Sequence, residues 1–262
     1  MAAILWLAAL VLGPLLADSS GNSAPSYTAA SIANTAASIA NYYAPNTFIT
    51  IYGQNLAFVT AAITPEDISG GILPTALIGT GVRVLVNQIA ADIYYVSPTQ
   101  VNLLVPTILI GGPAIVQLEV NGVAGPAVSI TLGATAPSLF QIDATTALAT
   151  HADGSLVTST SPAQGGEEIV LWATGLGPTA PPAIPNQVAE LAAPLAAISQ
   201  FQVLLNGVAV NPQSIAYAGA VPGYAGLFQI NVTLPSDVPQ NPQVQVATAD
   251  ATSPTQRYLP VQ

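Results

Sequence analysis

The only histidine of this 262-residue chain, His151, has the widest chemical repertoire of its side chains. It lies in the segment Thr150-His-Ala-Asp-Gly-Ser155, where a serine and a carboxylate (Asp153, or Asp143 nearby) could join it in a nucleophilic triad. The Gly-x-Ser-x-Gly turn that presents the nucleophile in one large class of hydrolases does not occur in the sequence. We therefore interpret His151 as a loop residue before an Asp-Gly turn, and we predict no catalytic residue.

Two pairs of neighbouring carboxylates, Glu66-Asp67 and Glu167-Glu168, could hydrolyse a glycoside if both members of a pair faced one site. Successive side chains on a strand point to opposite faces, so Glu167 and Glu168 are not expected to meet. We interpret these acids as solvated charge at strand edges.

Metal ligands are scarce in this sequence. Asp153, Ser155 and Asp143 could contribute oxygen atoms to a Ca²⁺ site, but no Asp-x-Asp-x-Asp-Gly run is present. One histidine and no cysteine are too few for a zinc site of the usual kind. The sequence therefore predicts no metal and no cofactor.

Charge is unusually sparse for a protein of this length. The chain has two arginines, no lysine and 12 acidic residues, which gives a net charge of −10 with only 5% of residues charged. A nucleic-acid partner is excluded because two basic side chains cannot neutralise a run of phosphates. The absence of cysteine excludes a disulfide scaffold, and the 51% hydrophobic content excludes a disordered chain.

The N-terminal part has two distinct compositions. Residues 1–17 carry no charge and are typical of an export signal, with a retained membrane anchor as the alternative. Residues 18–43 form a leader rich in Ala, Ser and Asn that contains a tandem heptad, Thr28–Asn34 and Thr35–Asn41. The heptad is either a helical stripe through its isoleucines or, as we favour, a small duplication that is extended in part.

From residue 44 onward the sequence is typical of β structure. Short runs of β-branched and aromatic residues alternate with turn signals such as Ser97-Pro98 and Asn121-Gly122, and Asn-Gly favours a two-residue hairpin. In the first half, strands are expected at residues 47–52, 82–86, 93–96, 101–105, 115–120 and 127–132. No stretch between them suits a helical crossover, so the pattern predicts an all-β sandwich.

The second half of the sequence repeats the first at an offset of roughly 120 residues, which suits a duplicated Ig-like domain. Residues 44–57 align with 164–177, 82–87 with 201–206, and 100–106 with 229–235, with one insertion near residues 219–226. The chain is thus expected to hold two tandem Ig-like β-sandwich domains, 44–135 and 136–262. Asn231, the first residue of a glycosylation sequon, is predicted to be a strand or turn residue equivalent to Asn102.

A row of exposed tyrosines and tryptophans would suit stacking on sugars, but core packing is the interpretation that we favour for most of them. Tyr52 and Trp172 are equivalent in the repeat and lie in apolar strands, so we expect both in the cores. Tyr224 lies in the insertion, within the loop Val221-Pro-Gly-Tyr-Ala-Gly226, and is our candidate for an exposed contact.

Four segments carry a resemblance to a known family: residues 44–56, 94–106, 171–178 and 217–231. Together they resemble the uncharacterised C-terminal domain of large secreted acidobacterial proteins, over roughly residues 26–262. The resemblance implies two Ig-like repeats of the IPT/TIG kind and export from the cell, without established catalytic or binding residues. In that family the module usually ends a much longer chain, whereas here it makes up nearly the whole sequence.

These observations favour a non-enzymatic, extracellular or cell-surface protein that serves as an adhesion or scaffold module. Its expected partners are other surface proteins, a polysaccharide or further copies of itself, and no membrane beyond the N-terminal anchor. The alternative is a subunit of an extracellular filament or layer, in which the leader adds a strand to a neighbouring copy. A hydrolase is the third and least favoured hypothesis.

Overall fold

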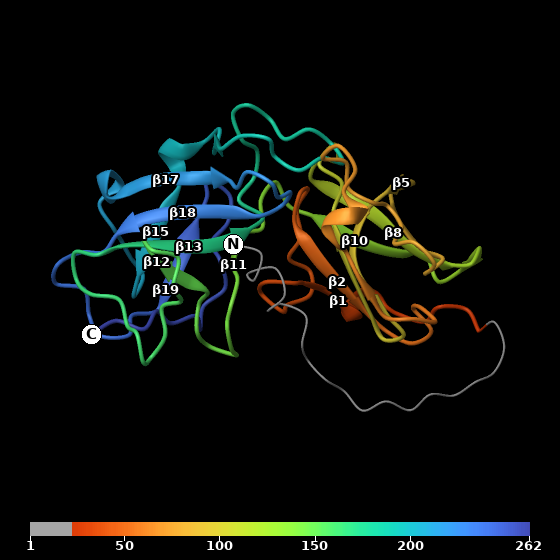
Figure 1. Cartoon of the computed structure of the whole chain (residues 1–262), viewed down its shortest axis with the longest axis horizontal. Coiled ribbons are helices and arrows are strands. Elements are labelled where there is room, and N and C mark those ends of the chain that lie inside the picture. Colours follow the sequence, from red (N-terminus) through yellow and green to blue (C-terminus); the bar gives the residue numbers. More distant parts are fainter. Residues whose placement is uncertain (1–22) are drawn as a thin grey trace.

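The computed structural model describes residues 23–262, so the proposed export signal lies outside the described residues. Strands account for 42% of the chain and helical turns for 5%, and the expected all-β fold of sandwich-like domains is confirmed. The two domains lie side by side, the first in orange to yellow-green and the second in green to blue (Figure 1). Within the described part of the chain, no helix is long and apolar enough to cross a membrane.

The first domain packs two antiparallel sheets face to face. One sheet has the strand order β1-β2-β7-β6-β3, and the other has the order β10-β8-β4-β5 with β9 added to β8. Their bounds are β1 Ile32–Asn34, β2 Phe48–Tyr52, β3 Ala61–Ala62, β4 Val82–Val86, β5 Ile89–Ala90, β6 Asp92–Ser97, β7 Gln100–Leu104, β8 Gly112–Val120, β9 Val123–Ala124 and β10 Val128–Leu132.

The second domain repeats this plan. Its larger sheet has the order β11-β13-β18-β17-β14 with β12 added to β13, and its smaller sheet has the order β16-β15-β19. The strands are β11 Ser138–Leu139, β12 Ala149–His151, β13 Glu168–Thr174, β14 Ala193–Pro194, β15 Gln202–Leu205, β16 Val208–Ala209, β17 Ile215–Ala220, β18 Phe228–Thr233 and β19 Val244–Ala247. Short 3₁₀ turns occupy Ala29–Ser31, Pro65–Asp67, Ile198–Gln200 and Pro212–Ser214.

Local details recur in both domains. The hairpin β8–β9 turns at Asn121-Gly122 as expected, and β15–β16 turns at Asn206-Gly207, each with two residues at positive φ. The register of β6 on β7 shifts between Ile93 and Tyr95, and that of β17 on β18 shifts between Ile215 and Tyr217. A bulge at the same place in both copies aligns β6 with β17.

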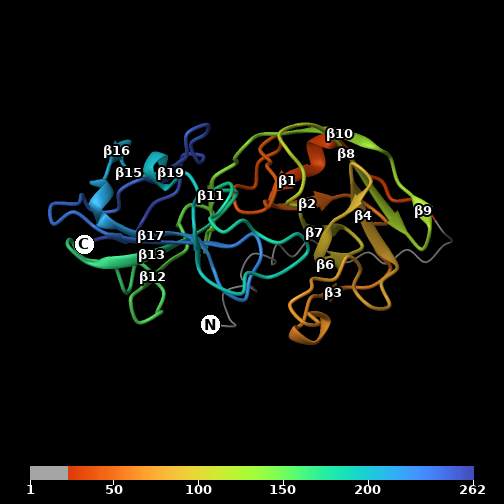
Figure 2. The same cartoon turned by 90° about the horizontal axis from the view of Figure 1, so that it is seen from above.

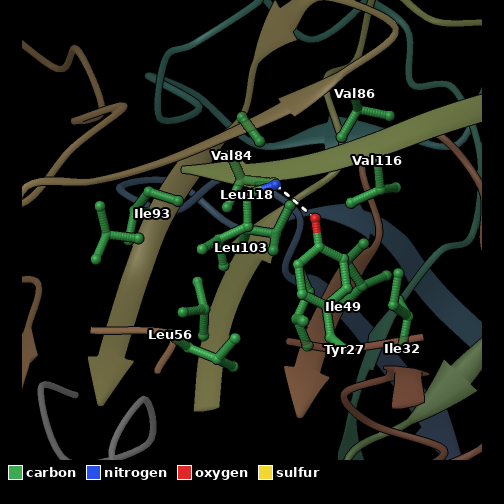
Figure 3. Packing of buried hydrophobic residues seen from close by; sticks show 14 of the residues in the cluster. Tyr27, Ile32, Ile49, Leu56, Val84, Val86, Ile93, Leu103, Val116 and Leu118 are labelled. Carbon is green, nitrogen blue, oxygen red and sulfur yellow. Dashed lines mark hydrogen bonds between the residues drawn. The ribbon is translucent and has the colours of Figure 1, made fainter. Parts of the chain in front are cut away.

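The core of the first domain is closed by a buried tyrosine. Tyr27 is 6% exposed, and Figure 3 shows its ring beside Ile32 and Ile49. Its hydroxyl donates to the carbonyl of Pro126 at 2.7 Å and accepts from the backbone N–H of Leu118 at 2.7 Å. One side chain therefore satisfies the buried N–H of Leu118 and also binds the carbonyl of the exposed Pro126.

The described part of the leader belongs to the first domain, which corrects our separation of residues 18–43 from the sandwich. β1 pairs with β2, and Ile32 is fully buried in the same core as Tyr27 and Tyr43. The two heptads fold differently, since the first forms a 3₁₀ turn and β1 while the second forms turns that leave Ile39 exposed. A helical stripe is therefore wrong, because pairing to β2 fixes the segment in an extended conformation.

The two domains meet along a tight junction. The backbone N–H of Phe48 donates to Oγ1 of Thr174 at 3.3 Å, and the rings of Phe48 and Phe140 lie 6.2 Å apart. The loop between β17 and β18 reaches the first domain at Gly226, where a Cβ atom would lie 2.3 Å from Cδ1 of Leu104. Glycine at this position permits the close approach.

Replacing Tyr27 with Phe is expected to destabilise the protein by about 1–3 kcal/mol, because it leaves the buried Leu118 N–H without a partner and removes the hydrogen bond to the Pro126 carbonyl. The measurement is the free energy of unfolding from a urea titration. Tyr258→Phe, at a tyrosine that is 42% exposed, is the control. An equal, small change in both variants would contradict the role assigned to Tyr27.

Candidate functional site

The larger sheet of the first domain turns one face to its core and the other away from it. Along β2, Ile49 and Ile51 are fully buried in the core, whereas Phe48, Thr50 and Tyr52 point to the outward face. Tyr52 is 43% exposed. Our expectation that Tyr52 packs in the core is therefore wrong, because Tyr52 is one of the alternate residues of β2 whose side chains point away from the core.

Four side chains of this outward face form the candidate site, which we call the amide–aromatic face: Tyr52, Tyr95, Gln100 and Asn102. Gln100 lies opposite Tyr52 on the neighbouring strand, and Asn102 lies opposite Tyr95. Nε2 of Gln100 donates to Oδ1 of Asn102 at 2.8 Å, which fixes both amides relative to each other. Gln100 has intermediate exposure and keeps further donor and acceptor capacity for a ligand, whereas Asn102 is only 7% exposed and holds the Gln100 amide in place.

The spacing of the two tyrosines follows from the sheet. Tyr52 lies on β2 and Tyr95 on β6, the two strands on either side of β7. Their partners on β7, Gln100 and Asn102, are two residues apart. The Cα atoms of the two tyrosines are therefore separated by about 12 Å, from the spacing of strands and of residues along them. Two aromatic rings with amides between them can stack on flat apolar faces and hydrogen-bond to hydroxyl groups at the same time.

The second domain carries the same pattern, but its aromatic ring, Trp172, is buried. Nε2 of Gln229 donates to Oδ1 of Asn231 at 2.6 Å, and Trp172 lies opposite Gln229 where Tyr52 lies opposite Gln100. Trp172 is only 7% exposed because it packs in a cluster with Val221 and Leu227 from the β17–β18 loop. The insertion that distinguishes the two repeats thus covers Trp172, whereas Gln229 and Asn231 keep intermediate exposure.

Tyr224, our candidate for an exposed contact, lies in this loop with intermediate exposure and packs against the Trp172 cluster. Its backbone carbonyl accepts from the N–H of Ala189 at 2.9 Å. The structure therefore places Tyr224 at the domain junction, apart from the four residues of the amide–aromatic face.

His151 has a different partner from those we considered. Its Nδ1 lies 2.5 Å from Oε1 of Glu167, and its Nε2 lies 3.1 Å from the carbonyl oxygen of Ser161 and 3.3 Å from that serine's Oγ. Asp153 and Asp143 instead accept hydrogen bonds from residues two or three positions ahead in their own turns. Glu167 is therefore not a solvated strand-edge charge, and sequence reasoning missed it because the two residues are 16 positions apart.

The order serine, histidine, carboxylate invites comparison with a catalytic triad. Glu167 raises the pKa of His151, chiefly through their hydrogen bond, and so favours the imidazolium form. Both ring nitrogens then donate, one to the carboxylate and one to the Ser161 carbonyl. Because the ring contacts the Glu167 carboxylate through Nδ1 and the Ser161 carbonyl through Nε2, we interpret the cluster as a brace between β12 and the start of β13.

The remaining acids do not converge. Asp67 accepts from the backbone N–H and hydroxyl of Thr64, and Glu168 is exposed opposite Thr233. Among residues 23–262, no three His, Cys, Asp or Glu side chains gather as a metal site would require. The sequence does not single out Asp92, because this residue opens an otherwise apolar strand. It is 6% exposed, and burial raises its pKa to about 7.

No protein-family model and no curated protein matches the chain. Among solved structures, the chain is similar to the surface glycan-binding protein PbSGBP-B from Prevotella bryantii, at 12% identity and a TM-score of 0.27, over 90% of this chain and 42% of that one. It is also similar to SGBP-B of the Bacteroides ovatus mixed-linkage glucan utilization locus, at 12% identity and a TM-score of 0.34, over 85% and 44% of the two chains.

A third similar structure holds the tandem Ig repeats of Dlar, at 14% identity and a TM-score of 0.19, over 69% of this chain and 81% of that one. The chain thus spans less than half the length of the two glycan-binding proteins. With TM-scores this low, the likenesses decide nothing about function, which has to be inferred from the site.

The His151–Glu167 pair should make stability depend on pH. Because the folded-state pKa of His151 is raised, its contribution is complete below the unfolded pKa of about 6.5 and is lost as the pH rises through the folded value. His151→Gln should therefore lower the free energy of unfolding by up to about 1 kcal/mol in mild acid and by less in mild alkali. Urea titrations at about pH 5.5 and about pH 8.5 measure the difference.

Glu167→Gln should reproduce this pH dependence, whereas Glu168→Gln, which changes the neighbouring exposed carboxylate, should not. Equal destabilisation by His151→Gln at both pH values would contradict the ion pair.

Proposed function

We propose that the protein is a non-catalytic binding protein of the cell surface or extracellular space, and that it binds a neutral polysaccharide through the amide–aromatic face. The observation that carries the proposal is the exposed ring of Tyr52 beside the hydrogen-bonded amides of Gln100 and Asn102. A pyranose ring offers an apolar face to a tyrosine and a rim of hydroxyl groups to the amides. The extended spacing of the two tyrosines suits a chain of linked sugars better than a single ring.

The charge of the protein narrows the ligand class. With a net charge of −10, the surface repels acidic polysaccharides, and the four residues of the face carry no charge. A neutral chain is bound without ion pairing, so the affinity should change little with salt.

Export remains a prediction from residues 1–17, and membership of the acidobacterial family remains a prediction from the four segments that resemble it. Adhesion and scaffolding are narrower forms of the same proposal, in which the bound polysaccharide belongs to another surface or to the cell's own matrix.

The filament hypothesis has less support. Its strand donor was the leader, but β1 already pairs with β2 of its own domain and Ile32 is fully buried. Deleting the leader would therefore remove part of the core, and a loss of assembly could not be told from a loss of folding. The two-residue edge strands β3, β5, β14 and β16 also offer little backbone for a neighbour to pair with.

Tyr52→Ala is expected to weaken binding to a neutral polysaccharide at least tenfold, or about 1.4 kcal/mol, because it removes the exposed stacking ring. Affinity gel electrophoresis measures this with gels that contain mixed-linkage glucan, xyloglucan, galactomannan or starch. Gln100→Ala should weaken binding to the same polysaccharide, since it removes one amide and releases the other.

Tyr258→Ala is the matched control, because this tyrosine is exposed to the same degree (42% against 43%) but lies outside the face. The proposal fails if the unaltered protein is retarded by none of the four polysaccharides, or if Tyr52→Ala and Tyr258→Ala behave alike.

A further inference from the structure

A small cavity lies at the domain junction, lined by residues of both domains. The first domain contributes Asn46 before β2, Asp92 at the start of β6 and Thr107 after β7. The second contributes Asn186, which lies in the segment between β13 and β14. In Figure 1 this segment is the teal loop that extends from the second domain toward the first.

Oxygen atoms without partners gather in the residues of this cavity. Oδ1 of Asn46, Oγ1 of Thr107 and Oδ1 of Asn186 are all buried and have no hydrogen-bond partner. No hydrogen bond within residues 23–262 ends on the carboxylate of Asp92, although this side chain is only 6% exposed. Buried polar groups normally find partners, so three such oxygen atoms beside the carboxylate of Asp92 indicate a bound species.

The backbone around these residues is fixed. Asn46 and Asn186 both have positive φ, at 59° and 61°. The N–H of Asn46 donates to the carbonyl of Val105 at 2.9 Å, and the N–H of Leu73 donates to the carbonyl of Asn186 at 3.0 Å. The second bond ties the segment between β13 and β14 to the first domain beside the cavity.

The size of the cavity decides what could occupy it. About 30 Å³ is open to the centres of water molecules, which is room for about two waters. An organic ligand needs a pocket of roughly 300 Å³ or more. The occupant is therefore an ion or water.

The charge of Asp92 favours an ion. Water can donate to all of these oxygen atoms, but it does not offset the negative charge that Asp92 carries once it has lost its proton. No basic side chain of the chain is available to do so. Arg83 lies across from Glu119 in the other sheet, Arg257 donates to backbone carbonyls, and His151 pairs with Glu167.

We propose that this cavity binds one Ca²⁺ ion, held by Asp92, Asn46, Thr107 and Asn186 and by water. Oxygen ligands in an irregular arrangement suit Ca²⁺, whereas Mg²⁺ demands near-octahedral geometry and retains most of its water. The site was not predicted from the sequence because its four ligands come from four separate segments. It is independent of polysaccharide binding, and its effect is to fasten the segment between β13 and β14, and with it the second domain, to the first.

The affinity should be modest because only one ligand carries a charge. Sites of this kind in extracellular modules have dissociation constants of roughly 10⁻⁴–10⁻³ M. At a hundredfold excess of Ca²⁺ over this constant, the melting temperature of the full chain should rise by roughly 5–10 °C over its value in EGTA. Isothermal titration calorimetry should give one ion per chain with an affinity in that range.

The experiment compares four variants by thermal melting in EGTA, in CaCl₂ and in MgCl₂ at equal ionic strength. Asp92→Asn should lose the Ca²⁺-induced shift while melting in EGTA no lower than the unaltered protein, since a neutral amide replaces a buried charge. Asn186→Gly, which keeps the positive φ, should weaken Ca²⁺ binding about tenfold. Asp143→Asn and Asp153→Asn change the exposed carboxylates first considered for Ca²⁺ and should keep the full shift.

Three results would overturn the proposal: no shift with Ca²⁺ in the unaltered protein, an equal shift in Asp92→Asn, or an equal shift with Mg²⁺. The first would assign the cavity to water, and the second would assign Ca²⁺ to the acidic surface. None of these results depends on binding to a polysaccharide, so the two proposals fail separately.

Discussion

The alternation of side chains along β7 and β18 is the constraint on which both domains depend. Every second residue of these central strands must be apolar to fill a sandwich core, as Val101 and Leu103 do in β7 and Ile230 and Val232 do in β18. The residues between them are left on a face that the sandwich does not cover. In both domains that face carries a glutamine and an asparagine two positions apart, joined by a hydrogen bond. The difference between the domains is the burial of the aromatic ring beside this pair, which is 43% exposed at Tyr52 and 7% exposed at Trp172.

In the second domain, the loop between β17 and β18 covers the ring of Trp172, whereas Gln229 and Asn231 themselves keep intermediate exposure. This loop is longer than the turn between β6 and β7, and it brings Val221 and Leu227 onto Trp172. The same loop reaches the first domain through Gly226 and helps to form the junction. One insertion therefore covers Trp172 in the second repeat and also brings the two repeats into contact. The first repeat lacks the insertion, so its face stays open at Tyr52.

Much of this architecture could be predicted from the sequence because it depends on local patterns. Period-two apolar runs, Asn-Gly turns and a repeat near 120 residues located most strands, the hairpin at Asn121-Gly122 and the insertion. The errors are of two kinds. One is the face of a strand to which a side chain was assigned, and the other is contacts between residues that are far apart in the sequence. Tyr52 and Trp172 are equivalent in sequence and share the outward parity, and only the loop that packs over Trp172 makes their exposure differ. The His151–Glu167 pair and the cavity oxygens join segments that only the tertiary fold brings together, so no spacing in the sequence could reveal them.

The small number of charged residues affects both the amide–aromatic face and the domain junction. A protein with two arginines and one histidine has few cations to place, and the structure uses all three elsewhere. An uncharged face then recognises its ligand by shape, stacking and hydroxyl contacts, which suits a neutral polymer. A buried acid in the same chain has no internal counter-charge, so its neutralisation must come from a proton or from an ion in solution. Asp92 lies where the first domain meets the segment between β13 and β14, so whichever cation it takes also acts on how firmly the two domains are held together.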